Sequence, residues 1–216
     1  NQITRSWFKN GVEVKQQSIS LYTGLVLFEK TINDSNIVTQ TSFYADGKPK
    51  STMKMYNNQF RILNIDTWYE NNVKKLEVRY TGKDYTVIHR DSLGNLIGCQ
   101  KWDNALKMND TTSYFYPSGK LFKRYTFDHG KLLNVVTLDS AGNRIANTCL
   151  ETGNGLFYNY TRESFKPQLS SIITYRGGLA DGKEFRLNRQ GDTTEITSYK
   201  EGRKDGEYIK FNGKNI

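Results

Sequence analysis

The sequence predicts an all-β protein, an elongated single-layer antiparallel β-meander of about nine hairpin repeats, each of roughly 24 residues. Three observations support this prediction: two interleaved series of turns with one period, strand-like segments between them, and an apolar fraction of only 36%. That fraction is lean for a single large core, which a sheet one layer thick does not need. The alternative is a β-sandwich, which also has many short strands but seldom keeps one period over nine units.

The first turn series consists of nine tetrapeptides whose first residues are 22 to 25 positions apart. They begin at Phe8, Ile32, Tyr56, Tyr80, Trp102, Phe127, Leu150, Tyr175 and Tyr199. Their glycines reach positive φ without steric cost, and their Asn and Asp side chains bond to turn backbone. We therefore expect one chain reversal here in every repeat.

A second turn series falls halfway through each repeat. Its tips are Gly24, Gly47, Asn72, Gly94, Gly119, Gly142, Gly191 and Gly213. The missing member should fall near residue 166, where the sequence TRESFKPQL has Pro167 and no glycine. We expect an irregular loop near 161–170. No linker or low-complexity segment divides the chain, so we predict a single domain over 1–216.

The segments between turns are expected to be strands of about eight residues, because they are rich in Thr, Val, Ile, Tyr and Phe and several of them alternate. The simplest arrangement is a single file of eighteen strands in which each hairpin touches only its neighbours. Strands near residues 1–10 and 207–216 would then be exposed edges. We expect Arg203, Lys204 and Lys210 to discourage edge pairing at the C-terminal end.

The net charge of +9 comes from 31 Lys and Arg residues against 22 Asp and Glu residues. A basic surface attracts anionic partners such as acidic proteins, acidic glycans, anionic lipids or nucleic acid. The basic residues are spread over all repeats without a run of five or more, which argues against nucleic acid. An acidic glycan or an anionic lipid is retained as an alternative to a protein partner.

Cys99 and Cys149 are two repeats apart and would lie about 19 Å apart in a single-file sheet. That is too far for a disulfide, so two unpaired thiols are predicted. No apolar stretch of about 18 residues is present, and no transmembrane segment is expected. The chain begins at Asn1 without Met, from which we expect that an N-terminal piece such as a signal peptide has been removed. A periplasmic, cell-envelope or secreted location is favoured over a cytoplasmic one.

The sequences YRGGLADGKEF at 175–185 and YKEGRKDGEYIKFNGK at 199–214 both contain Tyr-x-x-Gly-x-x-x-Gly followed by an aromatic residue. This pattern resembles the MORN repeat, and more closely its variant form in the bacterial YwqK-like group. The segments at 110–145 and 40–60 are similar to the same variant, although positions 63, 87 and 134 lack its second glycine. The resemblance implies a β-hairpin repeat protein, and the YwqK-like group is commonly labelled as antitoxins. DSLGNLIG and DSAGNRIA also resemble the YD-type repeats of Rhs toxin shells.

We expect no catalytic residues, no cofactor and no metal site. His89 and His129 are 40 positions apart, and neither has a Cys, His or carboxylate at ligand spacing. No nucleophile, zinc-protease or nucleotide-binding motif occurs. The glycines of GNG at 153–155 and RGG at 176–178 are explained by the turns that contain them.

The candidate binding residues are aromatic and recur at one phase of the repeat. Tyrosines lie three residues before three tips of the second turn series, and each follows a Phe or Trp. The pairs are Phe43 and Tyr44, Trp68 and Tyr69, and Phe115 and Tyr116. Adjacent strand residues point to opposite faces. We expect the Phe and Trp row to pack and the Tyr row to form a contact surface. The simpler alternative is that both rows only shield the sheet and neither binds a partner.

A second candidate surface surrounds the expected loop, where Tyr158, Tyr160 and Phe165 cluster. Loops on a rigid scaffold often carry function. The function expected from the sequence is therefore that of a non-enzymatic, protein-binding scaffold, envelope-associated or secreted. A toxin-neutralising antitoxin and a binder of acidic glycan or anionic lipid are the alternatives.

Overall fold

The structure is a computed structural model, and it describes residues 2–58, 61–145, 150, 152–163 and 166–211. Within these residues the chain forms β-strands and turns and no helix. The strands are β1 (Gln2–Lys9), β2 (Val12–Ser20), β3 (Val26–Ile32), β4 (Ile37–Phe43), β5 (Pro49–Tyr56), β6 (Ile62–Trp68), β7 (Lys74–Tyr80), β8 (Asp84–Arg90), β9 (Leu96–Asp103), β10 (Asp110–Phe115), β11 (Leu121–Asp128), β12 (Lys131–Thr137), β13 (Gly155–Glu163), β14 (Lys166–Arg176), β15 (Leu179–Leu187), β16 (Thr193–Lys200) and β17 (Arg203–Lys210).

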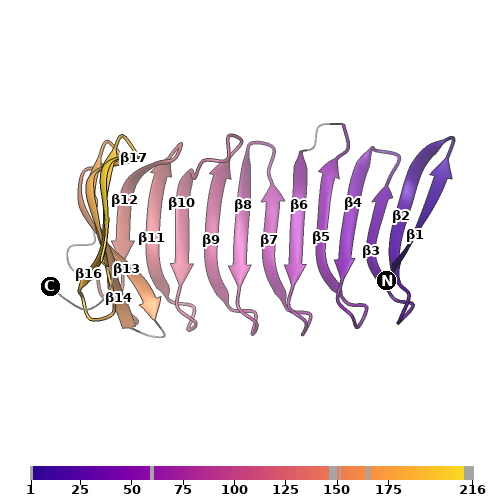
Figure 1. Ribbon diagram of the computed structural model, residues 1–216, viewed down its shortest axis with the longest axis horizontal. Helices are drawn as coiled ribbons and strands as arrows, with labels where there is room; N and C mark the ends of the chain where they lie inside the picture. Colours follow the sequence, from indigo (N-terminus) through magenta and orange to yellow (C-terminus); the bar gives the residue numbers. More distant parts are fainter. Residues whose placement is uncertain (1, 59–60, 146–149, 151, 164–165, 212–216) are drawn as a thin grey trace. The chain divides into compact units, whose positions relative to one another are not determined.

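The strands follow one another in chain order, as Figure 1 shows. β1 to β12 form one sheet and β13 to β17 form a second, and the pairings within both are antiparallel. The predicted antiparallel meander of hairpins is thereby confirmed. The described residues hold seventeen strands, one fewer than expected. The contacts group the chain into two compact units, Asn1–Cys99 and Gln100–Ile216, and we describe each by itself.

Most of the longer turns share one hydrogen-bond pattern, which Tyr44–Lys48 illustrates. The Tyr44 N–H donates to the Lys48 carbonyl at 2.8 Å, and the Gly47 N–H donates to the Tyr44 carbonyl at 3.0 Å. Gly47 has a φ of 83°, which a glycine adopts without a Cβ clash. The same pattern begins at Asn33, Tyr69, Asp91, Asp103, Tyr116, Asp139 and Asn188. Glycine takes the positive-φ position in five of these eight turns, and Asn36, Asn72 and Leu106 take it in the other three. The predicted turn at Gly213 lies outside the described residues.

The sheet of the Asn1–Cys99 unit has one face richer in apolar side chains and one polar face. Cross-strand neighbours on the first face include Met53, Ile65, Val78 and Val87. Cross-strand neighbours on the second face include Lys54, Asn64, Arg79 and Thr86. This division follows directly from the alternation of side chains along each strand.

In the Gln100–Ile216 unit, strands of the two sheets pack face to face. A buried cluster joins Leu132 and Val135 of β12 to Phe157 of β13 and Ile173 of β14. The rings of Tyr125 on β11 and Phe157 meet edge to face with centroids 6.2 Å apart. The expectation that each hairpin touches only its neighbours is therefore wrong for this unit, because burying apolar side chains of β11 and β12 requires a second layer.

The irregular loop expected near 161–170 is largely replaced by paired strands. The pairs Arg162–Pro167 and Glu163–Lys166 continue the ladder between β13 and β14 as far as these residues. Pro167 has no backbone N–H to donate. It is tolerated because β15 pairs with β14 only from Ser171 onward, so no strand on that side of Pro167 needs the hydrogen bond. The succession of strands is instead interrupted after Asp139–Asn143, where the described residues form only isolated bridges. The single-domain assignment stays a prediction.

Candidate functional site

The predicted tyrosine row connects successive turns through its hydroxyl groups. Tyr44 donates to the carbonyl of Trp68 at 2.7 Å, and Tyr69 donates to the carbonyl of Arg90 at 3.0 Å. In the second unit Tyr116 donates to the carbonyl of Leu138 at 2.8 Å. Each acceptor directly precedes the next turn of the same series. The recurring tyrosine thus fixes the spacing of neighbouring turns along one end of the strands.

This arrangement changes the interpretation of the tyrosine row. Tyr116 is fully buried, with its ring against Phe122 at a centroid distance of 5.2 Å. A contact role for Tyr116 is therefore wrong, because its ring and hydroxyl are both occupied inside the protein. Tyr44 and Tyr69 are half-buried, and a binding role for them stays a prediction. The preceding aromatic residues Phe43, Trp68 and Phe115 are half-buried as well.

The Tyr69→Phe variant should lower the free energy of unfolding by about 1 kcal/mol, because it removes one hydrogen bond and leaves the Arg90 carbonyl without this donor. Chemical denaturation of the whole chain measures the effect. Tyr22→Phe is the matched control, since Tyr22 is exposed in the turn between β2 and β3. Equal stability of both variants would contradict the role given to the tyrosine hydroxyls.

The second predicted surface is only partly within the described structure. Tyr158 and Tyr160 lie on β13 and are half-buried, whereas Phe165 lies outside the described residues. Tyr160 is cross-strand from Leu169. Its carbonyl accepts a hydrogen bond from the amine of Lys123, so its backbone takes part in packing within the unit. A binding role for these tyrosines stays a prediction.

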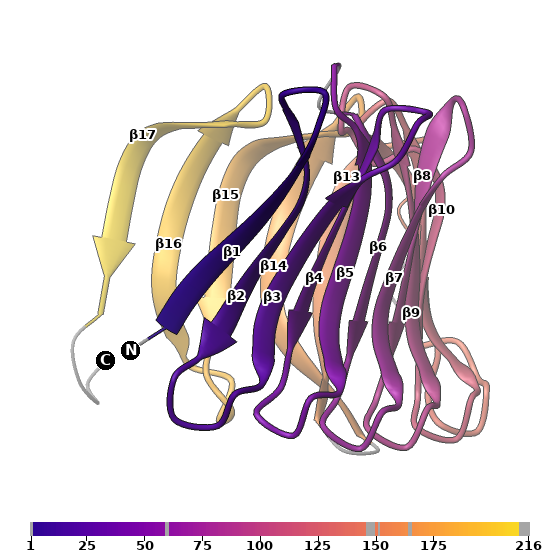
Figure 2. The ribbon, with the colours of Figure 1, turned by 90° about the vertical axis from the view of Figure 1, so that its right-hand side faces the viewer.

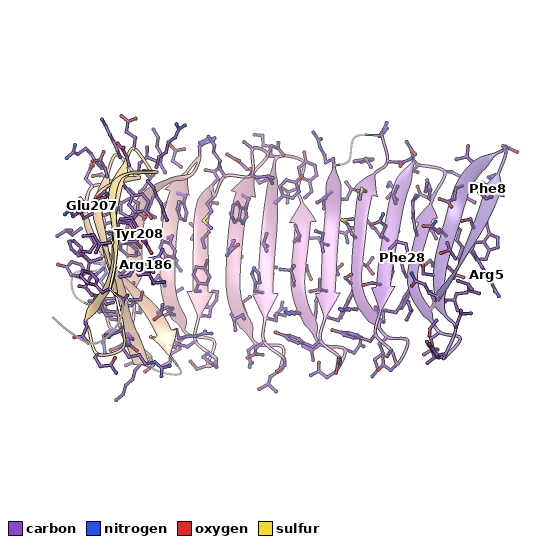
Figure 3. The ribbon with its side chains drawn as sticks, in the orientation of Figure 1. Arg5, Phe8, Phe28, Arg186, Glu207 and Tyr208 are labelled. Carbon is purple, nitrogen blue, oxygen red and sulfur yellow. The ribbon has the colours of Figure 1, made fainter. Side chains whose placement is uncertain are left out.

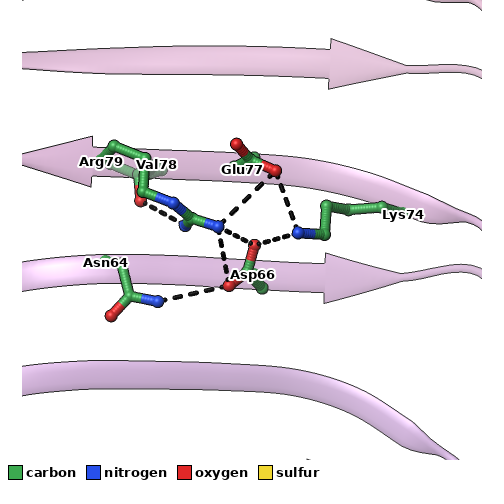
Figure 4. Close-up of polar contacts among 6 residues, drawn as sticks. All are labelled: Asn64, Asp66, Lys74, Glu77, Val78 and Arg79. Atoms are coloured by element: carbon green, nitrogen blue, oxygen red, sulfur yellow. Dashed lines mark hydrogen bonds and ion pairs between the residues drawn. The ribbon is translucent and has the colours of Figure 1, made fainter.

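A polar cluster on the sheet of the first unit brings two acidic and two basic side chains together (Figure 4). Arg79 donates to both carboxylate oxygens of Asp66, at 2.9 and 3.1 Å, and Lys74 lies 3.0 Å from Asp66 and 2.9 Å from Glu77. Burial acts to raise the pKa of Asp66, but the hydrogen bonds from Arg79 and Lys74 outweigh it and hold that pKa below its usual value. The charges satisfy one another, so this cluster stabilises the cross-strand pair Asp66–Glu77.

The buried amine of Lys123 on β11 is the strongest electrostatic feature of the second unit. The residue is 3% exposed, and its Nζ donates to Asn159 Oδ1 at 2.7 Å. The same Nζ lies 5.6 Å from the ring centroid of Tyr125 and 5.9 Å from that of Phe157. Desolvation lowers the pKa of Lys123 to about 8. Its contacts with Asn159 and Phe157 hold it within the packing of the two sheets, away from solvent.

A shallow pocket lies at the turns of the C-terminal sheet, where the two Tyr-x-x-Gly-x-x-x-Gly segments meet. Its lining includes Arg176, Asp181, Tyr199, Lys200 and Asp205. Arg176 and Asp181 approach to 3.8 Å. Basic and acidic side chains are mixed around the pocket, which gives it no preference for one sign of ligand charge.

Among the described residues, His89, His129 and Cys99 lie in separate places and share no site. His129 is exposed at a turn with Nδ1 2.6 Å from the Asp128 carboxylate, and burial lowers the pKa of His89 on β8. Cys99 is a free thiol, and Cys149 lies outside the described residues. Within the described part of the chain, no group of three or more His, Cys, Asp or Glu side chains could hold a metal ion.

The largest concentration of exposed apolar side chains lies on the first hairpin and the turn after it. Its members, here called the first-hairpin surface, are Ile3, Trp7, Phe8, Val12, Leu21, Tyr22 and Leu25. Phe8 is 65% exposed and Trp7 is 41% exposed. Figure 3 labels Phe8 and Arg5 on β1, the outermost strand of its sheet. Elsewhere in the described chain the exposed large apolar residues are scattered, at Leu93, Leu106, Leu156 and Tyr208.

Sequence analysis did not single out the first-hairpin surface, although it did expect an exposed edge at residues 1–10. The available signal was the sequence ITRSWFKNGV, in which apolar residues flank a hairpin turn. Which of them would stay exposed depends on contacts that a sequence pattern does not contain.

No helix in the described part of the chain is long and apolar enough to cross a membrane. No known family model matches the sequence, and no curated protein does.

Proposed function

We propose that this chain is a non-enzymatic binding protein that holds a protein partner on its first-hairpin surface. The observation that carries the proposal is the concentration of exposed apolar side chains between Ile3 and Leu25. These side chains lie at both ends of one hairpin, with Trp7, Phe8 and Val12 near one turn and the others near the next. Large exposed apolar areas mark interaction sites in soluble proteins. The hairpins behind it supply a scaffold of paired strands.

A protein partner fits this surface better than a glycan or a lipid headgroup does. Trp7, Phe8 and Tyr22 are the kinds of residue that protein interfaces favour at their centres. Two of the basic groups nearby are engaged: Lys15 pairs with Glu29 at 2.8 Å and lies 5.4 Å from the centroid of the Trp7 ring, and Lys9 lies 3.6 Å from Asp34. Apolar contact therefore outweighs positive charge on this hairpin.

The experiment is capture of partners from native lysate of the source organism by the tagged chain. The double variant Trp7→Ala and Phe8→Ala should reduce capture at least about tenfold, because truncating buried aromatic anchors removes much of the binding energy. Leu93→Ala is the matched control, since Leu93 is exposed on the same unit outside the surface. Undiminished capture by the double variant would contradict the proposal.

Salt dependence separates the alternatives. Capture through apolar side chains should change little as salt is added, because screening acts on exposed charges. A steep loss of binding with salt would instead favour an acidic glycan or an anionic lipid. Capture of a toxin that is neutralised by the chain would favour the antitoxin alternative.

A further inference from the structure

The first strand has one side without a strand partner. β1 pairs with β2 over Gln2–Lys9, and it is the outermost strand of its sheet. All of its residues are exposed. In an antiparallel edge strand, alternate residues direct their backbone N–H and C=O groups away from the sheet, where another strand can pair with them.

β17, the last strand of the second sheet, has the features that deter pairing. It carries Arg203, Lys204, Asp205, Glu207 and Lys210, so charges of both signs follow one another along the edge. Figure 2 shows β17 outermost in its sheet, next to β16. Charged edges of this kind suppress pairing with other chains. β1 lacks this alternation of signs, since its charged residues are Arg5 and Lys9 and both are basic.

The side chains of β1 specify what could lie beside it. Ile3, Arg5 and Trp7 share one face, because alternate residues of a strand project to the same side. A register shift between Trp7 and Phe8 limits the regular stretch to Gln2–Trp7. No ion-pair or hydrogen-bond partner is present for the Arg5 guanidinium among the described residues. An incoming strand would thus meet a positive charge between two apolar side chains.

We propose that the open edge of β1 binds an extended segment of a partner protein, in which an acidic residue is flanked two positions away on each side by apolar residues. This inference rests on the proposed function and specifies the kind of segment that the partner protein would contribute. Backbone pairing supplies the alignment, the acidic residue lies opposite Arg5, and the apolar residues lie opposite Ile3 and Trp7. A second copy of the chain fits less well, because β1 carries no acidic residue that could lie opposite Arg5.

The direct test uses an acetylated and amidated heptapeptide, Thr-Val-Thr-Glu-Thr-Val-Thr, titrated into the whole chain to millimolar concentration. Amide shifts in the ¹⁵N spectrum should be concentrated at Gln2–Trp7. A peptide with Lys in place of Glu should bind about tenfold more weakly, and the Arg5→Glu variant should reverse that preference. A peptide with alternate amides N-methylated on its pairing edge should not bind.

The control variant is Arg203→Glu on β17, the last strand of the second sheet, which should leave peptide binding unchanged. Absence of binding, shifts away from β1, or a charge preference that Arg5→Glu does not alter would each overturn the edge-pairing proposal. So would peptide-independent dimerisation that is lost in Arg5→Glu.

Partner capture keeps the two proposals distinguishable. Capture that is lost in the Trp7→Ala and Phe8→Ala double variant but unchanged in Arg5→Glu would leave the proposed function standing and overturn edge pairing. Unchanged capture in both variants would overturn both proposals.

Discussion

Replacing Gly153 with alanine should lower the free energy of unfolding by about 2–5 kcal/mol. A Cβ at this position would lie 2.6 Å from the Gly178 nitrogen and 2.8 Å from the Leu132 carbonyl oxygen. These are backbone atoms, which cannot move aside as a side chain can. Crowding a packed interior costs roughly 1–3 kcal/mol, and a φ of 74° adds about 1–2 kcal/mol for a residue with a Cβ.

The hydrogen bonds at Gly153 explain why this crowding affects the whole unit. The Gly153 N–H donates to the Leu133 carbonyl at 2.8 Å, and the Gly178 N–H donates to the Gly153 carbonyl at 2.8 Å. The Leu132 N–H donates in turn to the Gly178 carbonyl at 2.9 Å. Backbone of β12 is thus bonded directly to the turns around the second sheet, and an added methyl group would break this junction.

Gly119→Ala separates crowding from backbone strain. Gly119 has a φ of 80°, but a Cβ there would meet nothing within 4 Å. Denaturant unfolding should therefore show Gly153→Ala about 1–3 kcal/mol less stable than Gly119→Ala. Equal losses would mean that the contact between Gly153 and Gly178 does not exist in solution.

The second large effect concerns the pH dependence of stability and arises from Lys123. Its pKa is about 8 in the folded chain, below the usual 10.5, because burial disfavours the ammonium form. Between these values the unfolded chain binds more protons, so stability rises as pH increases. From pH 7 to pH 9 this single group should contribute a gain of about 1 kcal/mol.

The Lys123→Met variant tests this directly, because methionine keeps the apolar stem and removes the titrating amine. Its stability should rise by about 1 kcal/mol less than that of the native chain between pH 7 and pH 9. Lys166→Met, with an exposed lysine, controls for the loss of one basic residue. Parallel curves for the native chain and Lys123→Met would show that the amine is solvated.

The local parts of the fold were predictable from the sequence, and the packing was not. Turns such as Tyr44–Lys48 are visible because the positive φ at Gly47 demands a residue type that recurs at a fixed period. Strand alternation likewise places Lys123, Tyr125 and Phe127 on one face. Nothing local indicates that this face is covered by β13, which lies about 30 residues further along the chain.

Long-range packing also decides which of the candidate site residues are free to bind a partner, and a local sequence pattern does not contain it. The tyrosine period was recognised, but the acceptor of each hydroxyl lies 21 to 24 residues away, so the sequence alone did not reveal that the row serves packing. Gly153, Gly177 and Gly178 do lie in turns as predicted, yet the need for glycine at 153 and 178 comes from the close approach of the two turns. The exposed aromatics of β1 were unremarked because exposure depends on which strands are outermost.

Hydrogen exchange of the complex is the most direct test of the proposed partner surface. Amide exchange in the chain, measured by mass spectrometry with and without its captured partner, should slow within residues 2–25 and remain unchanged around Arg176–Asp205. Protection at the C-terminal pocket, or along β17 in place of β1, would contradict the account.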